Sequence, residues 1–145
     1  MMLNTLLVDE NLSYRQTLSD MLLLHFPLIG VDEAGNGREA LSKVEYCRPD
    51  LIFMDIQLPE ENGLDVTKEI KRVYRDIVII ILTSDDRQEC RQQAFQNGAY
   101  YFLSKDDAFC IENILTRVDM ARAGCHTIES GQNPARKGVP DRMAE

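Results

Sequence analysis

Short apolar runs alternate with longer stretches of mixed polarity along most of the chain. The apolar runs are Leu3–Val8, Ile29–Val31, Leu51–Met54, Ile77–Leu82 and Tyr100–Leu103. Each run is short enough to be a strand, and the third and fourth are apolar almost throughout. Strands that are covered on both faces of a parallel sheet have this character. The pattern therefore predicts five strands, with the third and fourth at the centre of the sheet.

The stretches between these runs carry apolar residues at helical spacing and predict five helices. The helices fall within residues 12–26, 40–44, 64–73, 87–96 and 111–121. Gly63 precedes the third, Asn97-Gly98 ends the fourth, and Asp106 can cap the fifth. Strand and helix thus alternate five times, and right-handed crossovers make this an open α/β sandwich of three layers. We expect a doubly wound five-stranded parallel sheet, (βα)5, in the strand order 2-1-3-4-5.

The alternation ends near Ala123. Residues 124–145 contain three glycines, two prolines and no periodic apolar face. We therefore expect residues 1–122 to form one folded domain and residues 123–145 to be a flexible tail or the stump of a linker.

The charge balance limits the partners that the chain can bind. It has 16 basic and 24 acidic residues, a net charge of −8, which repels phosphate backbones and anionic membranes. The longest strictly apolar run, Ile77–Leu82, is far shorter than the roughly 20 residues of a spanning helix. Asn4 and Thr5 interrupt the apolar start, so no signal peptide is expected, and four scattered cysteines suggest neither a zinc site nor a disulfide scaffold. We expect a cytoplasmic protein that binds neither nucleic acid nor membrane by itself.

Polar side chains follow four of the five predicted strands. Asp9 and Glu10 follow the first, Asp55 the third, Thr83 and Ser84 the fourth, and Lys105 the fifth. The second strand ends near Asp32-Glu33, which we do not expect to face the same site. Open α/β sheets bind ligands beyond the carboxyl ends of their strands, so the side chains after the other four strands are expected to converge.

This set of side chains predicts phosphoryl-transfer chemistry. Three carboxylates close together cannot all stay ionised without a cation, and ligation by oxygen alone favours a hard ion such as Mg²⁺. Lys105 would then supply positive charge, and Thr83 a hydroxyl donor, to an incoming anion. A carboxylate, a divalent metal, a lysine and a hydroxyl together form such a site.

Four segments resemble the CheY-like receiver domain of two-component response regulators. They are Leu-Leu-Val-Asp-Glu at 6–10, Phe-Met-Asp-Ile-Gln-Leu-Pro-Glu-Glu-Asn-Gly at 53–63, Leu-Thr-Ser at 82–84 and Phe-Leu-Ser-Lys-Asp at 102–106. The resemblance covers about residues 3 to 121, with the four segments in order and at receiver-like spacing. It implies a flavodoxin/CheY-like fold and a phosphoacceptor function for the domain at 1–122.

The resemblance also implies a role for each matching residue. Asp55 would accept a phosphoryl group from a sensor histidine kinase or a histidine phosphotransfer protein. Mg²⁺ would be held by Asp9, Glu10, Asp55 and the backbone carbonyl of Gln57, and the phosphate would pair with Lys105. The switch residues would be Thr83 and Phe102. The loop after Asp55 would be shaped by Pro59 and Gly63. Phosphorylation would draw Thr83 toward the phosphoryl group and Phe102 inward. The face of the fourth helix, fifth strand and fifth helix would then change, where a partner or a second copy could bind.

Two departures from the usual receiver pattern bear on the metal and on the output. Glu10 stands where aspartate is more frequent, and Asp106 follows the lysine where many receivers have proline. With residues 36–41, the second departure resembles the NarL/FixJ-type subgroup, whose members usually carry a DNA-binding module for transcription regulation. The segment after the fifth predicted helix is too short and too poor in apolar residues for that module. The chain is thus either a stand-alone receiver or the receiver portion of a longer regulator.

Three other functions remain as alternatives. A stand-alone receiver could serve phosphotransfer or docking without DNA-binding output. An aspartyl-phosphate phosphohydrolase would carry an Asp-x-Asp motif, whereas Gln57 is the second residue after Asp55. A flavin mononucleotide carrier would have a phosphate-binding loop after the first strand, where Asp9, Glu10 and Asn11 stand instead. We expect a signalling switch that assists its own phosphorylation rather than a turnover enzyme.

Overall fold

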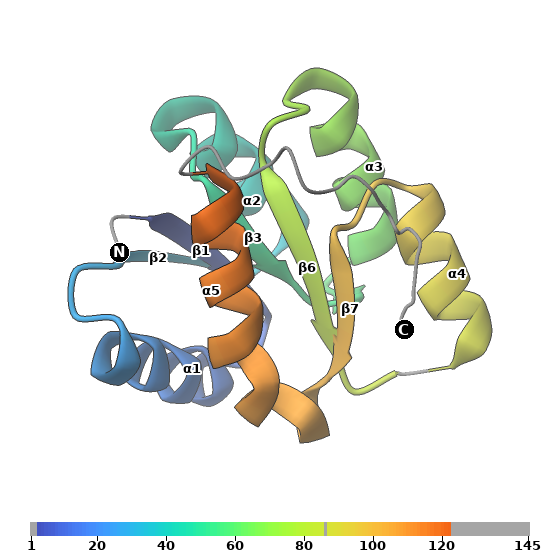
Figure 1. Cartoon of the computed structure of the whole chain (residues 1–145). Coiled ribbons are helices and arrows are strands. Elements are labelled where there is room, and N and C mark those ends of the chain that lie inside the picture. The colour runs from blue at the N-terminus through green and yellow to red at the C-terminus, as the bar shows by residue number, and fades with distance from the viewer. Residues whose placement is uncertain (1–2, 86, 123–145) are drawn as a thin grey trace. The chain divides into compact units, whose positions relative to one another are not determined.

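A five-stranded parallel sheet forms the centre of the fold. The computed structural model describes residues 3–85 and 87–122. The strands of the sheet are β1 (Asn4–Val8), β2 (Gly30–Ala34), β3 (Leu51–Met54), β6 (Val78–Thr83) and β7 (Tyr101–Ser104). Their order is β2-β1-β3-β6-β7, with every neighbouring pair parallel (Figure 1). When these five strands are numbered along the chain, the order is 2-1-3-4-5, which confirms the predicted topology.

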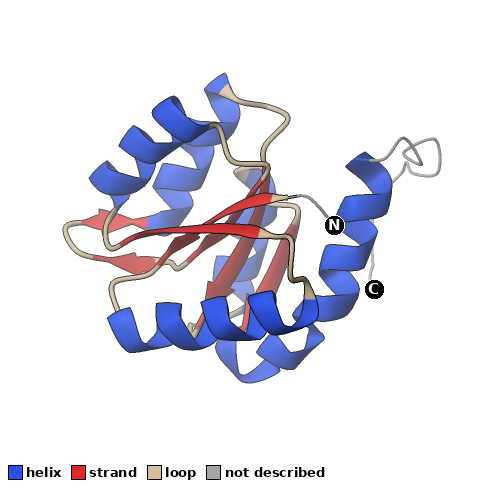
Figure 2. Cartoon of the chain, turned by 90° about the vertical axis from the view of Figure 1, so that its left-hand side faces the viewer, coloured by secondary structure: helices blue, strands red, loops and turns tan. Residues whose placement is uncertain are grey.

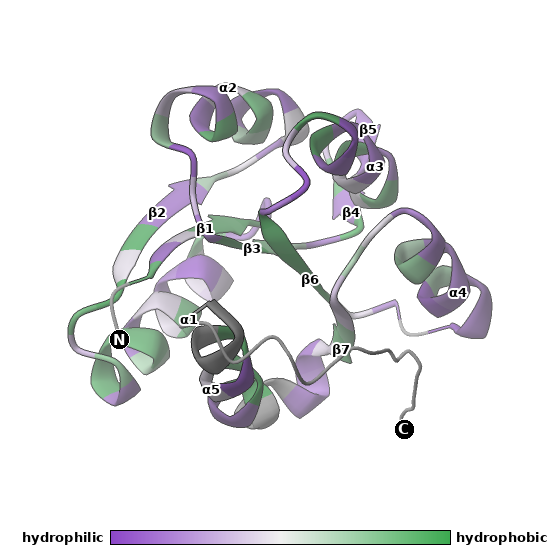
Figure 3. Ribbon diagram, turned by 45° about the horizontal axis from the view of Figure 1, so that its top comes forward, coloured by the Kyte–Doolittle hydropathy of each residue, from purple (hydrophilic) through white to green (hydrophobic). Residues whose placement is uncertain are grey.

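Four helices cover the two faces of this sheet. They are α1 (Leu12–His25), α2 (Gly37–Cys47), α3 (Gly63–Val73) and α4 (Gln88–Gln96). Figure 2 shows the strands between helices, and Figure 3 shows α2, α3 and α4 on one side of the sheet and α1 on the other. Because both faces are covered, all four residues of β3 are buried.

The helix beginnings are set by asparagine caps. The side chains of Asn11, Asn36 and Asn62 accept hydrogen bonds from backbone N–H groups in the first turns of α1, α2 and α3, respectively. Such a cap stabilises a helix by about 1 kcal/mol. α4 begins after Arg87 without a side-chain cap and buries only Cys90 and Ala94.

The segment after Asp55 is more ordered than the loop that the sequence predicted. β4 (Gln57–Leu58) and β5 (Glu61–Asn62) form a small antiparallel hairpin. Pro59 and Glu60 make its turn, and Glu60 has a φ of 63°, in the left-handed region. A proline followed by a residue with positive φ is the pattern of a type II turn, in which glycine or asparagine is usual at the second position. The turn could not be predicted from the sequence, because glutamate occupies the position where glycine or asparagine would indicate it.

Two details of the predicted helices were wrong. The spacing of apolar residues predicts Leu12 on the same apolar stripe as Leu18 and Leu22, but Leu12 is 55% exposed and α1 buries only the other two. Asp106 does not cap the fifth helix, because Lys105–Cys110 form the 3₁₀ helix η1, and α5 (Ile111–Arg122) begins after it. Ser104, the last residue of β7, instead accepts a hydrogen bond on its hydroxyl oxygen from the backbone N–H of Asp106 at 3.2 Å, at the start of η1.

The chain divides between Ile111 and Glu112 into two compact units, and each is described by itself. In the second unit, Thr116 of α5 donates a hydrogen bond from Oγ1 to the carbonyl of Glu112 at 3.0 Å. The predicted tail at 123–145 lies outside the described residues, so the predicted domain boundaries stay predictions. Among the helices described, none has the length and apolar character needed to cross a membrane.

Candidate functional site

The register of the sheet places two aspartates side by side. Val8 of β1 pairs with Met54 of β3, so that Asp9 and Asp55 are the residues that leave the two adjacent strands. The backbone N–H of Asp55 donates to the carbonyl of Val8 at 2.9 Å and extends the ladder by one bond. Both aspartates are buried, at 6% and 7% exposure. The sheet therefore holds two carboxyl groups in a site from which water is largely excluded.

Lys105 connects these two carboxylates. Its Nζ lies 2.6 Å from Oδ2 of Asp9 and 3.2 Å from Oδ2 of Asp55. Burial lowers the pKa of the Lys105 ammonium, but the hydrogen bond to Asp9 and the negative charges of Asp55 and Asp9 outweigh it, so the pKa is raised overall. Lys105 is thus a fixed positive charge between two buried acids.

The single positive charge of Lys105 does not neutralise the two negative charges of Asp9 and Asp55. The pKa of Asp55 is raised because the group is buried and because Asp9 carries a like charge; Lys105 and the hydroxyl of Thr83 act in the opposite direction. Oδ1 of Asp55 is buried and has no hydrogen-bond partner. Thr83 is fully buried, and its Oγ1 accepts a hydrogen bond from the backbone N–H of Asp85 at 3.2 Å. The site therefore has one unpartnered carboxylate oxygen and a deficit of positive charge.

These observations fit a hard cation. An unpartnered carboxylate oxygen in an all-oxygen setting is the kind of ligand that Mg²⁺ prefers. Glu10 and Gln57 are exposed, and in the part of the chain that the structure describes no three Asp, Glu, His or Cys side chains lie close enough to hold an ion. The structure thus brings Asp9 and Asp55 together but does not add Glu10 to them, and a metal-binding role for Glu10 stays a prediction.

Gly63 is packed directly against the backbone of Asp55. Its N–H donates to the carbonyl of Ile56 at 2.7 Å. A Cβ at this position would lie 1.8 Å from the Asp55 carbonyl oxygen, where no atom fits. Gly63 is therefore packed against the segment that carries Asp55, and the loop-shaping role of Gly63 and Pro59 stays a prediction.

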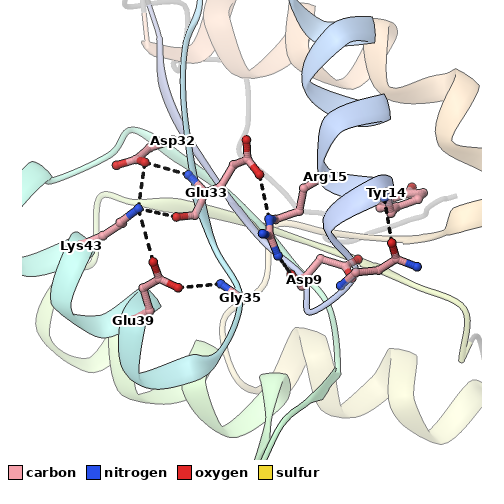
Figure 4. A network of polar contacts seen from close by, with 9 residues as sticks. Asp9, Tyr14, Arg15, Asp32, Glu33, Gly35, Glu39 and Lys43 are labelled. Carbon is pink, nitrogen blue, oxygen red and sulfur yellow. Dashed lines mark hydrogen bonds and ion pairs between the residues drawn. The ribbon is translucent and has the colours of Figure 1, made fainter.

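A polar network that the sequence did not reveal supports Asp9 from the side of β2. Arg15 of α1 donates to the carbonyl of Asp9 through Nη1 and to Oε1 of Glu33 through Nε at 2.7 Å (Figure 4). Lys43 of α2 in turn binds Asp32 at 2.9 Å, and this hydrogen bond lowers the pKa of the Asp32 carboxyl. Of the two acids near the end of β2, Glu33 is therefore linked to Asp9 through Arg15, whereas Asp32 binds Lys43. The sequence could not show this link, because 18 residues separate Arg15 from Glu33.

Tyr14 is a second residue that sequence reasoning missed. The Nζ atom of Lys105 lies 4.3 Å from the centre of its ring. Burial, and then the negative charges of Asp9 and Asp55, raise the pKa of Tyr14 to about 12, so the hydroxyl is protonated at neutral pH. An aromatic residue on an amphipathic helix usually packs in the hydrophobic core, so the sequence pattern does not predict the contact between Tyr14 and Lys105.

Phe102 is buried in β7, at 1% exposure. The guanidinium of Arg91 in α4 lies over its ring, 5.2 Å from the ring centre. In this structure the aromatic side chain thus already occupies an inward position. The switch role of Phe102 stays a prediction.

The fold and this site define a receiver, and comparison with known proteins agrees. The response regulator receiver domain matches residues 5–119, so the chain belongs to that family. Receiver domains are the signalling switches of two-component systems; they generally bind Mg²⁺ for phosphorylation and interact with histidine kinases or phosphotransfer proteins.

Relatives of several kinds share this domain. The chemotaxis protein CheY of Thermotoga maritima is 36% identical over 101 residues, which cover 69% of this chain and 82% of that protein. A protein-glutamate methylesterase/protein-glutamine glutaminase of Bacillus subtilis is 32% identical over 105 residues, 72% of this chain but 29% of that protein. The DNA-binding transcriptional activator DevR/DosR of Mycobacterium tuberculosis is 33% identical, over 72% of this chain and 48% of that protein. The chain thus spans less than half the length of two of these relatives.

Solved structures show the same fold. Chemotaxis response regulator CheY4 of Vibrio cholerae has a TM-score of 0.73 at 30% identity, covering 81% of this chain and 99% of that one. A CheY-like receiver domain from Methanospirillum hungatei has a TM-score of 0.76 at 20% identity, covering 85% and 98%.

Proposed function

We propose that Asp55 accepts a phosphoryl group from the phosphohistidine of a sensor histidine kinase or a histidine phosphotransfer protein. The observation that carries this proposal is the buried Asp55 carboxylate, with one oxygen paired to Lys105 and the other without a partner. The negative charge of this carboxylate is only partly neutralised by Lys105. The group is therefore a suitable acceptor for a phosphoryl group that binds together with Mg²⁺. Cytoplasmic localisation, which is typical of receivers, is part of the same proposal.

The chain's own residues would position and neutralise the transfer. One oxygen of the Asp55 carboxylate attacks phosphorus, the new O–P bond forms as the N–P bond of the donor breaks, and the imidazole leaves with the electron pair. Lys105 offsets the charge of the phosphoryl oxygens from one side, and the Thr83 hydroxyl donates to one of them. Mg²⁺, when bound by Asp9, Asp55, the carbonyl of Gln57 and Glu10, supplies further positive charge. No side chain is consumed except Asp55, so the product is a modified switch.

The acceptor can be identified by chemical trapping. We expect incubation with acetyl phosphate and Mg²⁺ to produce an acyl phosphate that borohydride reduces to homoserine at position 55. Peptide mapping should find the reduced residue there and at none of the other aspartates. Homoserine at Asp9 or at a surface acid such as Asp65, with position 55 unchanged, would contradict the proposal.

Mg²⁺ should stabilise the fold through the same carboxylates. A ligand at 100 times its Kd raises the free energy of unfolding by about 2.7 kcal/mol. We expect denaturation in urea to show this gain for the wild type and to show none for Asp9→Asn, because that variant loses one of the two converging carboxylates.

Two further variants decide whether Glu10 is a ligand. Glu10→Gln should weaken Mg²⁺ binding if the glutamate takes part, whereas the exposed Glu69 on α3 offers a matched control, Glu69→Gln. Equal Mg²⁺ stabilisation in the wild type and in the double variant Asp9→Asn, Glu10→Gln would show that the ion binds elsewhere.

The response to phosphorylation is proposed to be a population shift that reaches α4 and β7. Phe102 packs against Arg91 of α4, and α4 buries few apolar side chains, so the aromatic ring and this helix are coupled. We expect beryllofluoride to change the amide resonances of α4 and β7. Binding of a second copy or of a partner at the face that these elements form with α5 should change with them. Unchanged resonances on α4 and β7 at saturating beryllofluoride would contradict the shift.

We further propose that the output belongs to the NarL/FixJ-type class and controls transcription. The support is Asp106 after Lys105, the segment 36–41, and similarity to a relative whose name describes a DNA-binding activator. A two-component response regulator of the LuxR family from Aurantimonas, 25% identical with a TM-score of 0.73, is also similar. Expression of the complete reading frame of the gene and a DNA-binding assay would test this; a frame without a DNA-binding module would favour a stand-alone receiver.

A further inference from the structure

The aromatic ring of Tyr14 forms part of the binding site of the Lys105 ammonium. Three groups surround the Lys105 ammonium: Asp9 at 2.6 Å, Asp55 at 3.2 Å and the ring of Tyr14, whose centre is 4.3 Å away. The face of an aromatic ring attracts a cation by its quadrupole, and this attraction is stronger where water is excluded. The lysine side chain is 19% exposed, so most of its surface meets protein rather than solvent.

The position of Tyr14 is tied to Asp9 through the backbone. Oδ1 of Asp9 accepts from the N–H of Asn11 at 2.9 Å, and Oδ1 of Asn11 accepts from the N–H of Tyr14 at 3.0 Å. Arg15, the next residue, donates to the Asp9 carbonyl. Asp9 thus uses one oxygen to fix the start of α1, which carries the ring, and the other to bind the ammonium that the ring contacts.

Tyr14 and the phosphoacceptor line the same small cavity, and the buried tyrosine hydroxyl has no hydrogen-bond partner. Asp9, Tyr14 and Asp55 are among the residues that line a cavity of about 10 Å³. This volume is close to that of one water molecule, so the space is large enough for little else. The ring therefore closes one wall of the site as well as contacting the lysine.

We propose that Tyr14 is a positioning residue for Lys105. Its ring holds the ammonium between Asp9 and Asp55, and the rate of phosphoryl transfer then depends on Tyr14 through Lys105. The effect on the rate rests on the proposed function of Asp55, whereas the contact that positions the Lys105 ammonium against the Tyr14 ring does not.

A double-mutant cycle tests the consequence for the rate. We expect Tyr14→Phe, which keeps the ring, to take up phosphoryl groups from acetyl phosphate within about twofold of the wild-type rate. Tyr14→Leu should be about fivefold slower, equivalent to about 1 kcal/mol. In a Lys105→Ala background the Tyr14→Leu substitution should have no further effect, because the group it positions is gone. Tyr46→Leu, at an exposed tyrosine of α2, is the matched control and should leave the rate unchanged.

An NMR measurement tests the contact of Lys105 with the Tyr14 ring without any phosphoryl transfer. The ε-methylene protons of Lys105 should show upfield ring-current shifts in the wild type and in Tyr14→Phe, and these shifts should disappear in Tyr14→Leu. Their absence in the wild type would overturn the proposal. An equal slowing by Tyr14→Leu in both Lys105 backgrounds would also overturn it, since that result indicates a general effect on the fold. If the wild type shows the shifts but takes up no phosphoryl group, the proposed function fails and the contact of Lys105 with Tyr14 stands.

Discussion

Gly63→Ala should destabilise the fold by about 3 kcal/mol and impair phosphorylation of Asp55 at the same time. The added Cβ would lie 1.8 Å from the carbonyl oxygen of Asp55 and 2.8 Å from its carbonyl carbon. Backbone atoms cannot rotate away as the end of a side chain can, so either α3 or the segment that carries Asp55 must move. Since the N–H of Gly63 also binds the carbonyl of Ile56, the movement would break the link between the hairpin and the phosphoacceptor.

The chain contains a matched control for this substitution. Gly37 is the first residue of α2 and follows an asparagine cap, as Gly63 does in α3. A Cβ at Gly37 would meet the carboxylate of Glu61 at 2.6 Å, and this is the flexible end of a side chain. Urea denaturation should therefore place Gly37→Ala within about 1 kcal/mol of the wild type. Equal stability of the two alanine variants would contradict the argument from close packing at Asp55.

Lys105→Met should slow phosphoryl uptake by about a hundredfold, the effect of removing one preorganised charge from a transition state. Methionine keeps an unbranched side chain but removes the ammonium, and therefore the only cation that contacts both Asp9 and Asp55 in the described part of the chain. Without it, the pKa of Asp55, already raised by burial and by Asp9, should rise further.

The pH dependence of the same variant provides a second readout. The ionised carboxylate is the nucleophile, so uptake falls as the pH drops toward the pKa of Asp55. Because that pKa is raised, the fall should begin at a higher pH than for an ordinary aspartate, and at a still higher pH in Lys105→Met. Lys43→Met, which removes a lysine paired with Asp32, is the control. A Lys105→Met protein with the wild-type rate and pH profile would show that Lys105 does not act on the transfer.

The sequence predicted the fold and the main site because both follow from the parallel ladder. Apolar β3 and β6 indicated strands buried on both faces, and parallel strands end at one edge of a sheet. Asp9, Asp55 and Lys105 therefore had to converge once the strands were placed.

Side-chain reach and unusual backbone conformations could not be predicted in the same way. The contact of Arg15 with Glu33 and that of Tyr14 with Lys105 join residues far apart in sequence, and no local pattern announces them. The hairpin after Asp55 was missed because Glu60 adopts a conformation for which glycine or asparagine is the usual sign. Glu10 was expected at the site because it follows the first strand and matches the family motif, but its side chain is exposed beside a buried Asp9.

Intact-mass spectrometry decides whether Asp55 is the residue that takes the phosphoryl group. The wild type and Asp55→Asn should be incubated side by side with acetyl phosphate and Mg²⁺. Asparagine removes the charge that burial and Asp9 disfavour, so the variant should fold at least as stably as the wild type. We expect a gain of one phosphoryl mass in the wild type and no gain in Asp55→Asn. A folded Asp55→Asn protein that gains the same mass at the same rate would contradict this expectation.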